Sequence, residues 1–285
     1  MSTTGIQRVG VIGAGTMGNG IAQVFAQAGF SVRLLDSVPA AFDRARATIE
    51  KSLAKFVEKG KLQPADRDAA LGRLTFGGAL EDLAGADYVV EAIVEDVNAK
   101  RALFGRLDAV TRPHVILSSN TSSISITTLG AATRRPDKVL GMHFMNPVPL
   151  MTLVELVRGQ ATSAESMSTA LELCKTLNKT AVEAADYPGF IANRVLMPMI
   201  NEAMYALMEG VGSAEAIDTV MKLGMNHPIG PLALADFIGL DVCLAIMNVM
   251  HEGLGDPKYR PCPLLRRTVA AGHLGRKSGR GFYIY

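Results

Sequence analysis

A histidine and a glutamate near the middle of the chain have the chemistry needed to move a proton. His143 ends the apolar run Val139–His143, and Glu155 lies 12 residues later within the run Thr152–Val157. If the two runs pair as a hairpin, both side chains lie near the same place on adjacent strands. A carboxylate bonded to one ring nitrogen then fixes the imidazole tautomer and stabilises the imidazolium, so the other nitrogen can accept or return a proton. Without Glu155, His143 would more often be a structural histidine.

Three glycines with the spacing Gly-x-Gly-x-x-Gly, namely Gly13, Gly15 and Gly18, follow the first apolar run and open a helical pattern. They allow a tight turn and a close approach to a pyrophosphate, which the helix N–H groups face. Asp36 ends the next apolar run, where a carboxylate accepts hydrogen bonds from ribose hydroxyls and repels a 2′-phosphate. The pattern predicts an NAD site. The alternatives are a turn without a ligand and, for Asp36, a plain surface residue.

Hydride transfer between a nicotinamide and an alcohol or ketone also needs a group that exchanges the oxygen's proton, which is the role predicted for the histidine. The polar run Asn120-Thr121-Ser122-Ser123 follows the apolar Val115–Ser118. Its hydroxyls would lie at the carboxyl edge of a sheet, where ligands of doubly wound folds bind. It could equally cap the helical turn Ile124–Leu129, and the spacing does not choose between these interpretations.

Short apolar runs alternate with longer helical patterns in the first half of the chain, which is typical of a parallel sheet covered by helices. Between the first two runs, apolar residues from Met17 to Ala28 recur on one helix face, and Gly29 occupies the C-cap position. This βαβ unit predicts an α/β fold with a Rossmann-like doubly wound sheet. The expected strands are Val9–Ile12, Val32–Leu35, Tyr88–Ala92, Val115–Ser118 and Val139–His143.

The pattern changes after Leu156, where Ala164–Leu177 predicts a helix and Thr180–Ala184 a short strand. The breaker Asp186-Tyr187-Pro188-Gly189 follows. We therefore expect an NAD-binding domain over residues 1–186 and an all-α domain for dimerisation and substrate binding over residues 187–285.

Helical periodicity continues almost to the end of the chain, with expected helices from Ile191, over Ala214–Leu223 and over Ala233–Val249. The last of these is almost wholly apolar, and so small a domain cannot easily cover it. This predicts a homodimer through the helical domain. The alternative is an ordinary buried core helix.

The composition of the 285-residue chain excludes several classes of protein. Hydrophobic residues make up 48% and charged residues 20%, unlike a disordered protein. With 29 basic and 27 acidic residues, no global field favours nucleic acid or an anionic membrane. None of the three cysteines forms a C-x-x-C pair, which argues against disulfides and structural zinc. No secretory signal is visible, and the apolar segment Pro231–Met250 carries Asp236 and Asp241. We expect a cytoplasmic protein without a metal or a membrane anchor.

Motifs that extend along nearly the whole chain occur in one order: Gly13–Gly18, Glu91-Ala92 with Glu95 and Lys100, Ser119–Ser123, Gly141–Pro147, Leu153–Glu155, Pro188–Arg194, His227–Pro231 and Gly275–Phe282. Together they resemble the L-3-hydroxyacyl-CoA dehydrogenases, and the chain length resembles the bacterial 3-hydroxybutyryl-CoA dehydrogenase branch. One departure is Met145, where family members usually carry a phenylalanine. Methionine is flexible and apolar, so the shape of the acyl pocket is what this departure affects.

The resemblance implies an NAD-dependent enzyme that interconverts 3-oxoacyl-CoA and (S)-3-hydroxyacyl-CoA, with acetoacetyl-CoA and (S)-3-hydroxybutyryl-CoA as the short-chain pair. It implies His143 as the catalytic acid or base, Glu155 as its orienting partner, and hydrogen bonds from Ser122 and Asn193 to substrate oxygens. Besides the glycine loop, the implied NAD contacts are Asp36, Glu95, Lys100, Asn120, Asn146 and Lys277. The rival functions are a 3-hydroxy acid or sugar-acid dehydrogenase without CoA, and a nucleotide-binding scaffold without catalysis.

A row of lysines provides a separate indication of CoA. Lys51, Lys55 and Lys59 recur at i, i+4 and i+8, so a helix would place three ammonium groups on one face. Like charges at this spacing oppose a helix by about 0.2–0.5 kcal/mol per pair, which a phosphate-rich ligand would relieve. The alternative is a solvated face balanced by neighbouring glutamates. The predicted contacts with the CoA substrate are Ser52, Lys55, Lys59 and Ser122.

Overall fold

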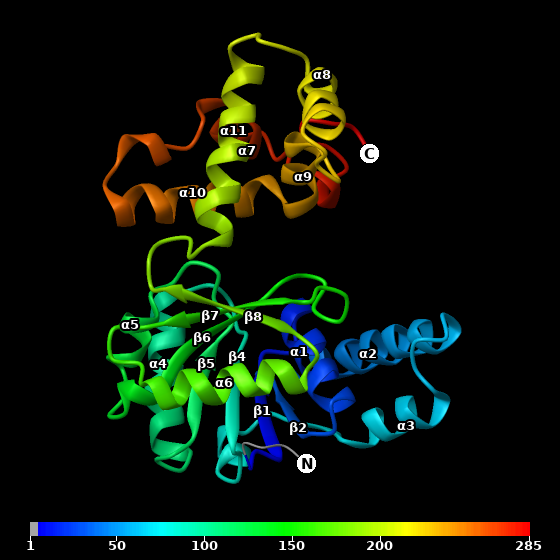
Figure 1. Cartoon of the computed structure of the whole chain (residues 1–285), viewed down its shortest axis with the longest axis vertical. Coiled ribbons are helices and arrows are strands. Elements are labelled where there is room, and N and C mark those ends of the chain that lie inside the picture. Colours follow the sequence, from blue (N-terminus) through cyan, green and yellow to red (C-terminus); the bar gives the residue numbers. More distant parts are fainter. Residues whose placement is uncertain (1–4) are drawn as a thin grey trace. The chain divides into compact units, whose positions relative to one another are not determined.

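The computed structural model describes residues 5–285, which form two compact units. One unit ends at Asp186 and the other covers Tyr187–Tyr285. Strands are confined to the first unit apart from isolated bridges near the end of the chain, and the second unit is helical (Figure 1).

The first unit contains one sheet of eight strands in the order β3-β2-β1-β4-β5-β6-β7-β8. All neighbouring strands run parallel except β6 and β7, which are antiparallel. Because β1 has β2 on one side and β4 on the other, the winding of the chain reverses there, and ligands bind at such switch points. The predicted doubly wound fold is confirmed. The strands are β1 (Arg8–Ile12), β2 (Ser31–Leu35), β3 (Leu74–Gly77), β4 (Tyr88–Glu91), β5 (Ile116–Ser119), β6 (Val139–Phe144), β7 (Leu153–Arg158) and β8 (Thr180–Ala185).

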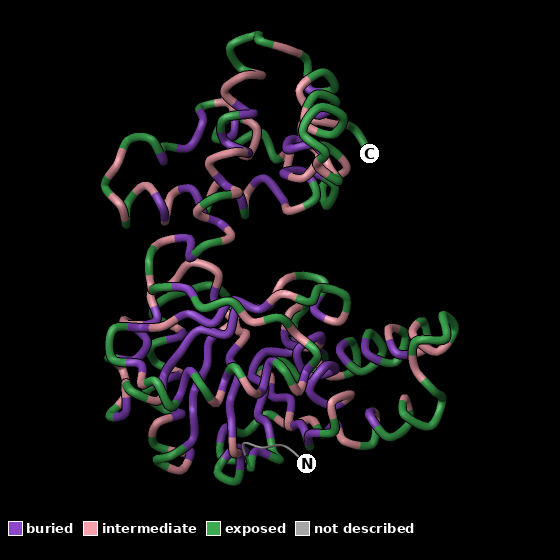
Figure 2. The backbone as a smooth tube through the Cα atoms, in the orientation of Figure 1, coloured by how far each residue is buried: buried purple, intermediate pink, exposed green. Residues whose placement is uncertain are grey.

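Helices lie on both sides of this sheet (Figure 1). Alternate strand residues such as Val11 and Met142 form one buried cluster with Phe25 of α1 and Leu173 of α6. The central strands are buried along most of their length in Figure 2, as parallel strands covered on both faces must be, whereas the edge strands β3 and β8 are mostly not buried. The helices are α1 (Thr16–Gln27), α2 (Ala40–Glu58), α3 (Pro64–Gly72), α4 (Val97–Val110), α5 (Ile126–Gly130) and α6 (Ala164–Thr176).

The second unit packs five α-helices around a methionine-rich core that includes Met197, Met204, Met247 and Met250. Methionine is flexible enough to fill irregular gaps between helices that cross at different angles. The helices are α7 (Ala192–Met208), α8 (Ala214–Thr219), α9 (Pro231–Ile238), α10 (Leu240–Leu254) and α11 (Pro263–Ala270).

The single helix predicted over Ala233–Val249 is wrong. The segment is divided at Gly239 into α9 and α10, which are bent by 97°. Gly239 has φ +104°, a conformation that residues with a Cβ rarely adopt. The helix predicted over Ala214–Leu223 also changes form, because α8 is followed by the π-helical turn Val220–Gly224. Among residues 5–285, no single helix is long and apolar enough to cross a membrane, and α9 with α10 passes such a test only as a bent pair.

The C-terminal segment is attached to these two helices by aspartates. The Asp236 carboxylate accepts hydrogen bonds from the backbone N–H of Phe282 (3.0 Å) and of Tyr283 (2.9 Å). Asp241 forms an ion pair with Lys277, with 2.6 Å between Oδ2 and Nζ. The two charges that interrupt the apolar sequence thus connect α9 and α10 to the end of the chain.

Candidate active site

The glycine loop between β1 and α1 has the steric features of a phosphate-binding turn. Gly13 has φ +100°, and a Cβ there would overlap the carbonyl oxygen of Ala92. A Cβ at Gly18 would overlap the carbonyl oxygen of Gly13. Gly15 faces open space, with no atom within 4 Å of where its Cβ would lie, and no side chain caps α1. The backbone at the start of α1 is therefore open to a ligand.

A cavity of about 550 Å³ adjoins this loop, and its lining includes Gly13, Gly15 and Asp36. Asp36 follows β2, and its carboxylate accepts hydrogen bonds from the N–H of Ala14 (2.7 Å) and of Val38 (2.9 Å). These bonds hold the carboxylate at the edge of the cavity. Each oxygen has a second lone pair, so the group can still accept from the hydroxyls of a ligand.

The expected hairpin of β6 and β7 forms, and its register sets His143 directly opposite Glu155. Cross-strand partners project on the same face of a sheet, and here the ring Nδ1 lies 2.8 Å from the carboxylate Oε2. Both residues are buried, Glu155 to 2% exposure. An ionised buried carboxylate needs a partner, and this one can fix the ring's tautomer and stabilise a positive charge on it.

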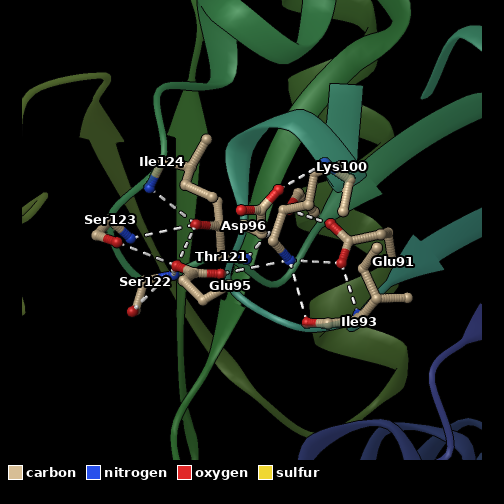
Figure 3. A network of polar contacts seen from close by, with 11 residues as sticks. Glu91, Ile93, Glu95, Asp96, Lys100, Thr121, Ser122, Ser123 and Ile124 are labelled. Carbon is tan, nitrogen blue, oxygen red and sulfur yellow. Dashed lines mark hydrogen bonds and ion pairs between the residues drawn. The ribbon is translucent and has the colours of Figure 1, made fainter. Parts of the chain in front are cut away.

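Glu91 and Lys100 form a buried ion pair beside the polar run that follows β5 (Figure 3). Lys100 is only 1% exposed, and its Nζ lies 2.5 Å from Oε1 of Glu91. The same carboxylate accepts the N–H of Ile93 (2.7 Å) and the hydroxyl of Ser119 (2.6 Å). The lysine predicted to contact NAD is thus held in the protein interior by a glutamate at the end of β4.

Glu95, the second partner of Lys100, organises the polar run itself. Its Oε2 lies 3.3 Å from Nζ of Lys100. Its Oε1 accepts the hydroxyl of Thr121 (2.6 Å), the N–H of Ser122 (2.9 Å) and the hydroxyl of Ser123 (3.1 Å). Burial alone would raise the pKa of Glu95, but the lysine and these donors outweigh it and hold the pKa below its usual value. Glu95 is therefore ionised at neutral pH.

The cap of α5 is a different residue, Ser125, whose hydroxyl accepts the N–H of Thr128. Within the polar run, Asn120 accepts the N–H of Phe144 through its Oδ1 at 2.9 Å. Because Phe144 follows His143, this bond connects the run to the strand that carries the histidine. Thr121 in the same run accepts the N–H of Ile124 at 2.8 Å, so the run also caps the turn that leads into α5. A contact between this run and a ligand stays a prediction.

The other predicted residues belong to other elements of the fold. Asn146 is exposed in the connection after β6. Lys55 and Lys59 are exposed on α2 and at its C-terminal end, with Ser52 half-buried one turn before Lys55. Asn193 and Lys277 belong to the second unit, where Asn193 is buried near the start of α7 and Lys277 forms the ion pair with Asp241.

Comparisons with known proteins identify the family of the chain. Residues 8–187 match the family model described as "3-hydroxyacyl-CoA dehydrogenase, NAD binding domain", and residues 189–285 match the C-terminal domain of the same name. The chain belongs to the 3-hydroxyacyl-CoA dehydrogenase family. It is an NAD-dependent enzyme.

Two relatives and one solved structure are similar over nearly the whole chain. A probable 3-hydroxybutyryl-CoA dehydrogenase of Deinococcus radiodurans is 58% identical over 98% of this chain and 100% of its own. A probable 3-hydroxybutyryl-CoA dehydrogenase of Bacillus subtilis is 56% identical over 98% of both chains. The crystal structure of (S)-3-hydroxybutyryl-CoA dehydrogenase PaaH1 from Ralstonia eutropha is 50% identical, with a TM-score of 0.95 over 98% of this chain and 99% of that one.

The residues around the cavity next to the glycine loop suit the NAD cofactor of this family. The open backbone at Gly15 and the uncapped start of α1 can receive the pyrophosphate, and the Asp36 carboxylate can receive ribose hydroxyls. A negative charge at Asp36 disfavours the additional phosphate of NADP.

Sequence reasoning missed one wall of this cavity, which is formed by Ala99, Ala102, Leu103 and Arg106 of α4. These residues recur at i, i+3, i+4 and i+7, so their spacing shows that they share a helix face. Two of them are alanines and one is charged, and such a composition does not predict a helix face that packs in the core. Nothing local in the sequence says that it borders a ligand cavity.

We expect Asp36→Ala to weaken NADH binding by roughly 10- to 100-fold, because hydrogen bonds to a charged acceptor contribute about 1.5–3 kcal/mol. The preference for NADH over NADPH should fall as well, since the repelling charge is gone. Fluorescence titration with both cofactors measures these effects. Asp43→Ala, which removes an exposed carboxylate from α2, is the matched control. Unchanged affinity and preference in Asp36→Ala would refute the assignment.

Proposed function

We propose that this enzyme interconverts acetoacetyl-CoA and (S)-3-hydroxybutyryl-CoA, with His143 as the acid or base and Glu155 as its orienting partner. The observation that carries the proposal is the 2.8 Å contact between His143 Nδ1 and Glu155 Oε2 in the paired strands β6 and β7. The names of the relatives, at 50–58% identity, support the choice of substrate.

When bound, NAD(H) accepts or supplies the hydride. In the reductive direction, the His143 imidazolium donates its proton to the oxygen on C3 of the substrate, and in the oxidative direction the neutral ring takes that proton back. Glu155 keeps Nδ1 protonated, so Nε2 is the nitrogen that exchanges the proton. Ser122 and Asn193 are proposed to hydrogen-bond the substrate oxygens and so limit the orientations of the reacting carbon.

Loss of NADH absorbance tests the reaction directly. We expect rapid loss with acetoacetyl-CoA and little with free acetoacetate. Activity on the free acid in preference to the thioester would favour a 3-hydroxy acid dehydrogenase. Tight NADH binding without turnover of either compound would favour a non-catalytic scaffold.

The lysines of α2 are proposed to receive the phosphates of CoA, together with Ser52. Lys51, Lys55 and Lys59 are all exposed, on one face of the helix and its C-cap. Replacing all three by glutamine should raise KM for acetoacetyl-CoA by about 10-fold, at roughly 0.5 kcal/mol for each screened charge contact. KM for a truncated acetoacetyl thioester without phosphates should stay the same. If both KM values change equally, the lysines do not bind CoA.

Two further assignments are part of the proposal. Residues 1–186 would bind NAD, and residues 187–285 would form a homodimer and contribute to substrate binding. The apolar side chains of Val195, Leu223, Met225 and Phe237 are exposed in the second unit and support burial against a second copy. Sedimentation equilibrium tests the dimer, and a monomer mass at micromolar concentration would contradict it.

The cytoplasm is proposed as the location of the enzyme. The three cysteines, Cys174, Cys243 and Cys262, are free and buried, as expected in a reducing compartment. Cell fractionation tests this, and recovery of the enzyme outside the cytoplasm would contradict it.

A further inference from the structure

Glu91 is a buried acid that the proposed chemistry does not use. It ends β4 and has 0% exposure, yet it carries a carboxylate in a strand that is otherwise apolar. Its two oxygens accept from Ile93, Ser119 and Lys100 at 2.5 to 2.7 Å. A buried charge is costly unless it is paired and hydrogen-bonded, and Glu91 meets both conditions. The side chain is therefore fixed from three directions.

A chain of contacts leads from Glu91 to Ser122 (Figure 3). Lys100 bonds Glu91 at 2.5 Å and lies 3.3 Å from Glu95. Glu95 in turn accepts the N–H of Ser122 at 2.9 Å. The Lys100 ammonium is thus shared between two carboxylates, and its shorter contact is with Glu91, the more deeply buried of the two.

Glu95 lies at different distances from the two polar groups of Ser122, its backbone N–H and its hydroxyl. Oε1 of Glu95 receives four donors, and a carboxylate oxygen has only about two lone-pair directions. The Ser122 hydroxyl is the most distant of the four at 3.4 Å, whereas its backbone N–H is held at 2.9 Å. Of the two groups, Glu95 therefore holds the Ser122 backbone N–H more closely, and through it fixes the backbone from which the hydroxyl projects.

We propose that Glu91 and Lys100 are positioning residues for the Ser122 hydroxyl and act on it through Glu95. The proposal rests on the proposed function for the role of Ser122 toward the substrate. Its physical basis is the distribution of charge, because one buried ammonium balances two carboxylates. If Glu91 loses its charge, Lys100 has Glu95 as its remaining ionised partner in this network. Glu95 then moves toward the lysine and away from the N–H of Ser122.

Glu91→Gln tests this with little change in shape. The amide oxygen can still accept from Ile93, and the amide nitrogen can donate to the Ser119 hydroxyl. We expect kcat/KM for acetoacetyl-CoA to fall about 10-fold, as a displaced hydrogen bond of roughly 1.4 kcal/mol predicts.

The deciding measurement is a double-mutant cycle with Ser122→Ala. If Glu91 acts through Ser122, Glu91→Gln adds little loss of kcat/KM once the hydroxyl has been removed. If the two losses multiply, Glu91 acts elsewhere and the proposal is overturned. Should Glu91→Gln fail to fold, Glu91→Asp replaces it, since that change keeps the charge but withdraws the carboxylate from Lys100 by one methylene group. A smaller loss with the same coupling supports the proposal, and multiplied losses overturn it.

Asp108→Asn is the matched control for loss of a carboxylate paired with cations. Asp108 lies on the same helix, α4, and is ion-paired with Arg134 (2.9 Å) and Arg135 (3.1 Å), away from Glu95. We expect it to lower Tm without changing kcat/KM. An equal kcat/KM loss in this variant would mean that general destabilisation explains both results, which overturns the proposal.

The two proposals fail in different ways. Wild-type enzyme that does not oxidise NADH with acetoacetyl-CoA contradicts the proposed function. Normal wild-type turnover with multiplied losses in the cycle contradicts only the positioning role.

Discussion

His143→Gln should lower kcat for acetoacetyl-CoA reduction by about 10²–10⁴, which is the usual contribution of a positioned acid or base. The glutamine amide can still donate a hydrogen bond to Glu155, so the hairpin keeps its buried contact and the variant should fold. It cannot carry the proton that the C3 oxygen needs. NADH affinity should change little, because the histidine acts on the substrate. Steady-state kinetics with saturating NADH and a fluorescence titration separate the two quantities.

Glu155→Gln is the companion variant and should have a smaller effect, about 10- to 100-fold in kcat. It keeps a hydrogen-bonding group opposite His143 but removes the charge that stabilises the imidazolium. The imidazolium that donates the proton would then lack its counterion, and steady-state kinetics with acetoacetyl-CoA measure the loss. Wild-type turnover in His143→Gln or in Glu155→Gln would contradict the proposed dyad.

Several strands that the sequence predicted are buried almost completely, although β8 was also predicted with only Ala184 buried. In β1, β4 and β6 almost every residue is buried, so the strands appear as continuous apolar runs with ends accurate to about one residue. β3 was missed because it lies at the sheet edge and only Leu74 is buried, which leaves no run to recognise. The bend at Gly239 was also missed, since apolar periodicity on both sides of it hides a change of direction that the backbone alone makes.

Some parts of the candidate site could also be predicted from the sequence, and others could not. The glycine loop and the hairpin are local in sequence, so spacing predicted that Gly13, Gly15 and Gly18 share one turn and that His143 faces Glu155. Their roles toward NAD and the substrate stay predictions.

The environment of Lys100 could not be predicted. Its charge suggests exposure, and only tertiary contacts with Glu91 from β4 and Glu95 place the ammonium in the interior. The contact from Ser119 to Glu91 spans 28 positions in the chain and joins neighbouring strands, so no spacing rule reveals it.

Asp236 shows how a charge in an apolar helix is explained by distant partners. In the sequence it only interrupts a hydrophobic segment. In the structure it is 1% exposed and accepts the N–H groups of Phe282 and Tyr283, with the Tyr285 hydroxyl at 3.2 Å. A Cβ at Gly281 would overlap its carboxylate, so the backbone of the last residues passes directly over it. The same segment carries Lys277, which is predicted to contact NAD.

We therefore expect Asp236→Ala to destabilise the protein by about 3–5 kcal/mol, because two half-buried N–H groups lose a charged acceptor worth roughly 1.5–3 kcal/mol each. Urea unfolding followed by circular dichroism measures the loss, and trypsin should cut faster after Arg276, Lys277 and Arg280 as the segment detaches. Glu252→Ala, which removes an exposed carboxylate of the same unit, should change neither quantity appreciably. Native-like stability together with an unchanged cleavage rate in Asp236→Ala would show that the segment is held by its aromatic side chains and not by this carboxylate.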